Sequence, residues 1–247
     1  MRWLFATLAA LALTLAPTPP RLVAQTTPDA PVRALLVTGV DYEGHLWRET
    51  APALRNVLER ENRCEVRIVE DPDFLASPTV FNYDVVILHF KNYAPLKHET
   101  EARDNLVNLV KQGKGLVCIH FASGAFEDWP EFVNLAGRVW DRKTGHDPFG
   151  PFTVHIVQPE HPITRNMPDF QAFDELYTCL VGDPSIEVLA TARSKLTGED
   201  HPMAFVLHYG SGRVFHTPLG HDVRSIETPG VAELLRRGCD WAAGRAP

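Results

Sequence analysis

Three near-continuous apolar stretches constrain the fold of this chain more than any other feature. They are residues 33–40 (RALLVTGV), 84–90 (DVVILHF) and 115–120 (GLVCIH). Runs of this length are typical of strands that are buried on both faces of a parallel sheet. Residues 47–61 and 98–113 lie between such stretches and carry apolar residues at helical spacing, which predicts helices. Alternating strands and helices imply right-handed crossovers, and hence a doubly wound α/β sheet.

One further strand is expected in the first half, and the second half is richer in strands. Predicted strands cover residues 64–70, 152–157, 175–181, 186–192, 203–209 and 212–218. Several connections in the second half are too short for a helix, so some of these strands must be antiparallel. Thr228 is the expected N-cap of a last helix that starts at Pro229. We therefore predict one α/β domain over residues 33–244, with a mainly parallel sheet and additional antiparallel strands in its C-terminal half.

The N-terminus has the features of a signal peptide. Arg2 provides a positive charge, and residues 4–16 form an uncharged apolar run. That run is shorter than the roughly 20 residues of a membrane span but suits a signal-peptide core. We expect a signal peptide at residues 1–24, a proline-rich linker at 25–32 and a periplasmic or secreted protein. The alternative is an N-terminal anchor that is retained.

Export would place the four cysteines, at positions 64, 118, 179 and 239, in an oxidising compartment where they can pair. Cys118 lies within an apolar strand pattern, and Cys239 lies on the apolar side of a helix pattern. A domain of this size has a core that needs no disulfides. We therefore expect buried free thiols.

Charge and composition narrow the range of partners. The 24 Lys and Arg residues against 31 Asp and Glu residues give a formal charge of −7, which argues against nucleic acid as a partner. Near-average hydrophobic and charged fractions, 45% and 22%, exclude a disordered chain. After cleavage of the signal peptide we expect no membrane association. Assembly into a homo-oligomer is compatible with the sequence.

Histidines follow several of the predicted strands. His45 lies after the first strand, His120 ends the strand at 115–120, and His221 follows the last strand. The carboxyl ends of parallel strands meet at one edge of a sheet, so we expect these imidazoles to lie close together. His120 also precedes three small residues, at the turn where related architectures hold a nucleophile. A histidine at this turn, in place of a cysteine, argues against a glutamine amidotransferase.

Two chemistries fit these residues, and their spacing does not decide between them. His120 and His221 can act as general acid and base, with Glu175 as the carboxylate that orients a ring. Alternatively, His45, His120 and His221, with Glu175, can hold a divalent metal such as zinc. No other cofactor is expected. The candidate substrate-binding residues are His45, Trp47, Phe121, Trp129, His146 and Glu175.

The order of several motifs resembles a known family. The matching stretches include GKGLVCIHFASGAF at 113–126, HPIT at 161–164, DELY at 174–177, GRVFHTPLGHD at 212–222 and RGCDWAAG at 237–244. Together with matches near 35–47, at 83–88 and at 129–146 they cover nearly all of residues 33–244. The chain resembles the ThuA-like (trehalose utilisation) family of the class I glutamine amidotransferase-like superfamily. The resemblance implies a flavodoxin-like fold and a link to carbohydrate catabolism, in which 3-keto-glycosides are candidate intermediates.

From the residues and the resemblance together, we expect an exported enzyme whose partner is a small carbohydrate. It would act on a sugar or a 3-keto-glycoside by histidine-based acid–base chemistry, as a hydrolase, a lyase or an isomerase. The alternative is a non-catalytic saccharide-binding module, in which the histidines only form hydrogen bonds with hydroxyl groups. An adaptor for an oxidoreductase has no sequence feature in its favour.

Overall fold

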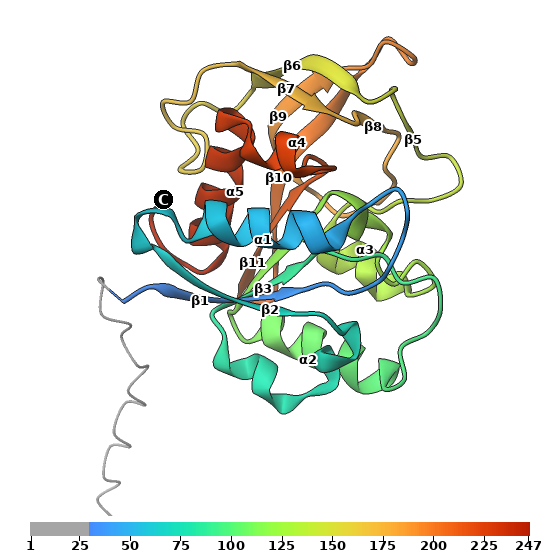
Figure 1. Cartoon of the computed structure of the whole chain (residues 1–247), viewed down its shortest axis with the longest axis vertical. Coiled ribbons are helices and arrows are strands. Elements are labelled where there is room, and N and C mark those ends of the chain that lie inside the picture. Colours follow the sequence, from blue (N-terminus) through green and yellow to red (C-terminus); the bar gives the residue numbers. More distant parts are fainter. Residues whose placement is uncertain (1–29) are drawn as a thin grey trace, which may run out of the picture. The chain divides into compact units, whose positions relative to one another are not determined.

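The computed structural model describes residues 30–247, which form a nine-stranded mixed sheet with helices on both faces (Figure 1). The expected signal peptide at 1–24 and residues 25–29 of the expected linker lie outside the described residues. The strand order is β2-β1-β3-β4-β11-β10-β9-β6-β7. The strands are β1 (Val32–Val37), β2 (Cys64–Val69), β3 (Val85–Leu88), β4 (Gly115–Ile119), β6 (Gly150–Ile156), β7 (Phe170–Asp174), β9 (Glu187–Arg193), β10 (Asp200–Tyr209) and β11 (Gly212–Thr217).

The first five strands of this order, β2-β1-β3-β4-β11, are all parallel. Numbered along the chain they have the order 2-1-3-4-5, which defines a flavodoxin-like sheet. Successive β1 side chains enter opposite cores: Leu36 packs on one face and Leu35 and Val37 on the other, all fully buried. The prediction from the near-continuous apolar runs is confirmed: these strands are apolar throughout because both faces of the sheet are covered.

Within residues 30–247, five α-helices cover the two faces of the sheet. They are α1 (Trp47–Leu58), α2 (Glu99–Lys111), α3 (Pro130–Ala136), α4 (Val223–Glu227) and α5 (Pro229–Ala242). Apolar residues of α1, α4 and α5 share one core, and those of α2 and α3 share the other (Figure 1). Short 3-10 helices, η1 (Arg60–Asn62), η2 (Pro72–Ala76), η3 (Pro78–Asn82) and η4 (His120–Gly124), complete the connections.

The C-terminal half of the sheet is antiparallel, as predicted, but its boundaries differ from the prediction. The strand expected at 175–181 is reduced to β8 (Tyr177–Thr178), which pairs with β5 (Gly145–His146). The left-handed backbone of Cys179, with φ 58°, ends the extended run there. The edge strand β7 precedes it and was not predicted.

The last helix begins at Pro229, as predicted, with Thr228 at its N-cap position. The Thr228 hydroxyl makes no capping hydrogen bond to α5, and it donates to the carbonyl oxygen of Arg224 at 2.9 Å. Asp222 instead caps the preceding helix α4 by accepting from the Ser225 amide at 2.8 Å. Two helices, α4 and α5, therefore begin in close succession after β11.

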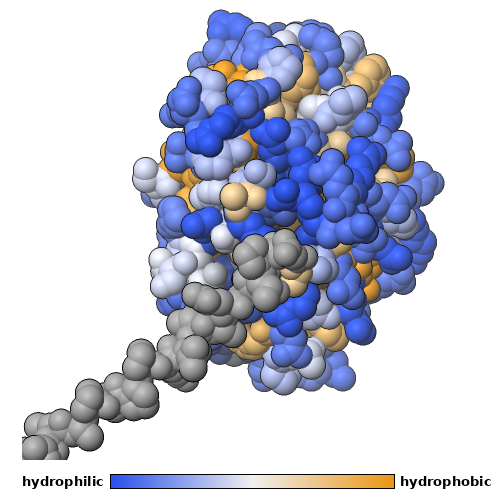
Figure 2. Space-filling view, turned by 90° about the vertical axis from the view of Figure 1, so that its left-hand side faces the viewer, coloured by the Kyte–Doolittle hydropathy of each residue, from blue (hydrophilic) through white to orange (hydrophobic). Residues whose placement is uncertain are grey.

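Within residues 30–247, all four cysteines are free, as expected. Cys64, Cys118 and Cys239 are buried and Cys179 is exposed. The coloured residues on the face in Figure 2 are mainly hydrophilic, and their hydrophobic residues form separate small patches. In the described part of the chain, no helix combines the length and the apolar character needed to cross a membrane.

Gly39 follows β1 and allows the chain to turn toward the segment that carries His45. Its φ is 114°, and a Cβ atom there would lie 2.0 Å from the carbonyl oxygen of Glu70. Substitution must therefore move backbone as well as strain the turn.

We predict that Gly39→Ala lowers the free energy of unfolding by about 2–5 kcal/mol, from a left-handed alanine and a backbone clash. Gly198→Ala is the matched control: Gly198 also has a positive φ, 71°, but nothing lies within 4 Å of its Cβ position. It should cost only about 1–2 kcal/mol. Urea denaturation measures both, and equal losses would contradict the assigned clash.

Candidate functional site

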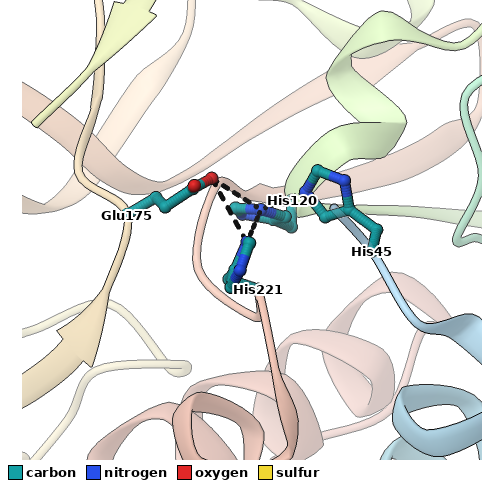
Figure 3. Close-up of side chains that lie close together, drawn as sticks. All are labelled: His45, His120, Glu175 and His221. Carbon is teal, nitrogen blue, oxygen red and sulfur yellow. Dashed lines mark hydrogen bonds and ion pairs between the residues drawn. The ribbon is translucent and has the colours of Figure 1, made fainter. Parts of the chain in front are cut away.

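Four side chains from separate connections converge beyond the ends of the strands (Figure 3). His45 follows β1, His120 directly follows β4, His221 follows β11 and Glu175 follows β7. One nitrogen or oxygen atom from each lies within 4.8 Å of the corresponding atom of the others. The ring centroids of His120 and His221 are 5.3 Å apart, so both rings can act on one reacting centre.

His120 occupies the sharp turn that the sequence singled out. Its φ is 50°, a left-handed conformation that costs a non-glycine residue about 1–2 kcal/mol, and its side chain is fully buried. The Nδ1 atom lies 2.7 Å from the carbonyl oxygen of Pro218. A carbonyl oxygen can only accept, so Nδ1 carries the proton of the ring. In the neutral imidazole, Nε2 then presents a lone pair to the cluster.

The Nε2 atom of His120 has more polar neighbours than one lone pair can serve. His45 Nε2 lies 2.9 Å away, the Tyr177 hydroxyl 3.0 Å, His221 Nδ1 3.3 Å and Glu175 Oε2 3.5 Å. Figure 3 shows the four labelled side chains directed toward one another. His120 Nε2 is therefore the central atom of the site.

Electrostatics separate the roles of the other three side chains. Burial, with the nearby imidazoles, lowers the pKa of His45 to about 2, which keeps this ring neutral. Burial disfavours ionisation of Glu175, but its contacts with His120 and His221 hold its pKa well below the usual value. Burial likewise opposes the charged form of His221, yet Glu175, 3.2 Å away, raises the pKa of His221 overall. Glu175 and His221 thus form an ion pair beside a neutral ring.

A second carboxylate, Asp174, fixes two of the connections in place. Asp174 is fully buried and accepts hydrogen bonds from the Gly220 amide at 2.7 Å and the His221 amide at 3.3 Å. It also accepts from the Ser225 hydroxyl and from the Glu175 amide. Burial raises the pKa of Asp174, and these donors oppose the rise. The carboxylate therefore connects the end of β7 to the segment after β11 and aligns Glu175 with His221.

The cluster opens into a cavity of about 180 Å³. Its lining is aromatic and polar: Tyr42, Gly44, His45, Lys91, Tyr93, Phe121, Trp140, His146, Glu175, Tyr177 and His221. Phe121 stacks on the His45 ring, with centroids 4.4 Å apart. His146, predicted as a binding residue, also lies in this wall, with Nδ1 3.6 Å from Glu175 Oε1.

Two of the predicted binding residues lie away from this cavity. Trp47 is buried at the start of α1, and its Nε1 atom donates to Asp41 at 2.7 Å beside a separate cavity. Trp129 is partly buried at the start of α3, where it packs against Phe126 and Phe132. Their aromatic character therefore serves packing at these positions, and the structure gives neither one a place in the wall of the cavity.

Sequence reasoning missed several lining residues, namely Tyr42, Lys91, Tyr93, Trp140 and Tyr177. Tyr177 carried a usable signal, because it lies two residues after Glu175 in an extended segment, where side chains share a face. Trp140 belongs to a long irregular connection, and nothing in its local pattern distinguishes it from a core residue.

His89 shows what a purely structural histidine looks like in this fold. It is fully buried at the end of β3, with Nδ1 3.3 Å from the Thr38 hydroxyl and Nε2 3.4 Å from the Thr50 hydroxyl. Both ring nitrogens are satisfied. In the cluster, by contrast, the buried Nδ1 of His45 has no hydrogen-bond partner among the described residues.

By its fold and site, this is an α/β protein of the flavodoxin-like class that carries a histidine–carboxylate cluster at the ends of its strands. The family model described as trehalose utilisation, ThuA, matches residues 33–242. The chain therefore belongs to the ThuA family, which links it to carbohydrate use. Among curated proteins, no significant match is found.

Solved structures agree with this assignment. A ThuA-like protein from Parabacteroides merdae is 26% identical, with a TM-score of 0.78 over 87% of this chain and 91% of that one. A ThuA-like protein from Bacteroides uniformis is 23% identical, with a TM-score of 0.70 over 89% and 94% of the two chains. The cytoplasmic protein STM1381 from Salmonella typhimurium, 16% identical with a TM-score of 0.60 over 87% and 100%, shares the fold.

The buried position of Asp174 generates a prediction about stability. Asp174→Ala leaves buried amide and hydroxyl donors without an acceptor and should cost about 3–5 kcal/mol of unfolding free energy. Asp174→Asn retains one acceptor oxygen and should cost less. Asp200→Ala is the control, because Asp200 is exposed and only 3.5 Å from exposed Arg193, and it should change stability by under about 0.5 kcal/mol. Chemical denaturation compares the three variants, and a loss for Asp174→Ala as small as the control's would disprove its anchoring role.

Proposed function

We propose that this ThuA-family chain is an enzyme that acts on a sugar or an oxidised (3-keto) glycoside at the His120–Glu175–His221 cluster. The observation that carries the proposal is the convergence of these groups, from three distant connections, around the Nε2 atom of His120. Burying ion-paired and unsatisfied polar groups beside a cavity lowers the stability of the fold. Such groups are characteristic of active sites.

Proton transfer is the chemistry that we assign to this cluster. His221 and Glu175 both border the cavity, 3.2 Å from each other, so a ligand there lies within reach of either group. His120 lies behind them, fully buried, with its ring direction fixed by Pro218. A general acid and base in this arrangement suit a hydrolase, a lyase or an isomerase that moves protons at a sugar carbon or oxygen.

The shape of the cavity supports a small carbohydrate as ligand. Its volume of about 180 Å³ is below the roughly 300–1,000 Å³ of drug-sized ligand sites, which favours a single sugar ring over a longer saccharide. Aromatic rings of Tyr42, Tyr93 and Trp140 in the wall offer apolar surfaces for the C–H face of a sugar. Lys91 and His146 offer polar groups for its hydroxyls.

We further propose that the protein is exported and acts in the periplasm or outside the cell. The positive start and the apolar run at residues 4–16 support this location. Intact-mass measurement of the protein from its native host, after cell fractionation, should show a mature chain that lacks about the first 24 residues. A full-length mass in the cytoplasmic fraction would contradict export.

The enzymatic proposal is tested by turnover of a panel of glycosides and their 3-keto derivatives. His120→Ala, His221→Ala and Glu175→Gln should each lower kcat by about 10²–10⁴-fold while the ligand still binds. His155→Ala is the control, because His155 is a surface residue that pairs with Asp169, and it should keep full activity.

A saccharide-binding module would give a different result. The same three substitutions would then weaken binding in calorimetry, and the unmodified protein would turn over no member of the panel. That outcome would exclude catalysis and leave carbohydrate recognition in its place.

A further inference from the structure

We infer that the cluster is a divalent transition-metal centre, with His45, His120, His221 and Glu175 as its ligands and zinc as the best-fitting ion. This inference rests on the proposed function, because it assigns a cofactor to the same site. It also changes the role of the imidazoles, which become ligands. Proton transfer then passes to groups at the border of the cavity, such as His146.

The distances between donor atoms match a coordination shell. Zinc–nitrogen bonds of about 2.0–2.1 Å in a tetrahedron place neighbouring ligand atoms about 3.3 Å apart. Four of the distances in this cluster are 2.9, 3.3, 3.5 and 3.2 Å, and all ligand atoms lie within 4.8 Å of one another. Small side-chain rotations would bring the four ligand atoms around one ion.

The protonation pattern also points to a cation. His120 donates its Nδ1 proton to the Pro218 carbonyl, which is the usual outer-shell arrangement of a metal-bound histidine, and leaves the Nε2 lone pair free. The Nε2 atom of His45 faces that lone pair at 2.9 Å. A cation between the two rings would accept the Nε2 lone pairs of both at once.

The donor set and the surroundings indicate the kind of ion. Three imidazoles and one carboxylate suit zinc or a similar first-row transition ion better than magnesium or calcium, which prefer oxygen ligands. His221 and Glu175 face the cavity, so a sugar hydroxyl or carbonyl oxygen can approach the ion from that side as a fifth ligand. A bound ion of this kind would supply Lewis-acid polarisation of that oxygen.

The neighbouring histidine His89 provides an internal contrast. It is equally buried, but both of its nitrogens are occupied by threonine hydroxyls. The same fold thus contains a histidine built for packing, and a separate group of three whose nitrogens face one point. Packing alone does not require that convergence, because each ring could have been paired with a hydroxyl as His89 is.

The test measures metal binding directly. Protein stripped with a chelator and dialysed should bind one equivalent of Zn²⁺ in calorimetry. It should also show the visible absorption of a four-coordinate nitrogen–oxygen site when Co²⁺ is added instead. His120→Ala and His45→Ala should weaken Zn²⁺ binding by about 100-fold or more, since losing even an outer-shell partner costs 10–100-fold. Glu175→Gln should weaken it less.

Two controls keep the result interpretable. His155→Ala removes an exposed histidine outside the cluster and should leave Zn²⁺ affinity unchanged. Circular dichroism of each variant, together with the conservative His45→Gln, separates loss of a ligand from loss of the fold. Binding with unchanged affinity in the cluster variants, or no stoichiometric binding at all, would overturn the inference.

Failure of this inference and failure of the proposed function have different signatures. Turnover by metal-free protein that a chelator does not affect would overturn the metal centre and keep the acid–base enzyme. Tight stoichiometric Zn²⁺ binding without turnover of any glycoside would keep the metal centre and remove the catalytic proposal.

Discussion

The hydrogen bond from the Nδ1–H of His120 to the carbonyl oxygen of Pro218 is the interaction on which the site depends. It joins the end of β4 to the end of β11, two neighbouring parallel strands. It fixes both the direction of the ring and the position of its proton, so that Nε2 faces the other connections. The left-handed backbone of His120 aims the ring, and the two strand ends hold this strained conformation in place.

Much of this arrangement was predictable because it follows from periodicity and topology. Apolar runs with little polar interruption identified β1, β3 and β4 as strands covered on both faces. Once the strands were parallel, residues at their carboxyl ends had to meet at one edge of the sheet. That rule brought His45, His120 and His221 together in the sequence analysis, and the structure places them around one point.

The rest of the site depends on tertiary contacts that local sequence does not encode. Trp47 and Trp129 have the side chains of sugar-binding residues, yet whether an aromatic ring packs in the core or lines a cavity depends on where distant elements lie. Trp140 reaches the cavity from a long irregular connection whose course is set by its neighbours. The strand expected at 175–181 is shorter in the structure because one left-handed residue, Cys179, turns the chain.

The position of Glu175 has a consequence for the behaviour of the whole domain. Glu175 comes from the connection after β7, at one edge of the sheet, whereas His45 follows β1, close to the opposite edge. Occupancy of the site therefore requires the parallel and antiparallel halves to be assembled at the same time. By mass action, a ligand bound there opposes separation of the two halves. Amide exchange should then slow across the entire sheet, because the bound ligand stabilises the two halves as one cooperative unit.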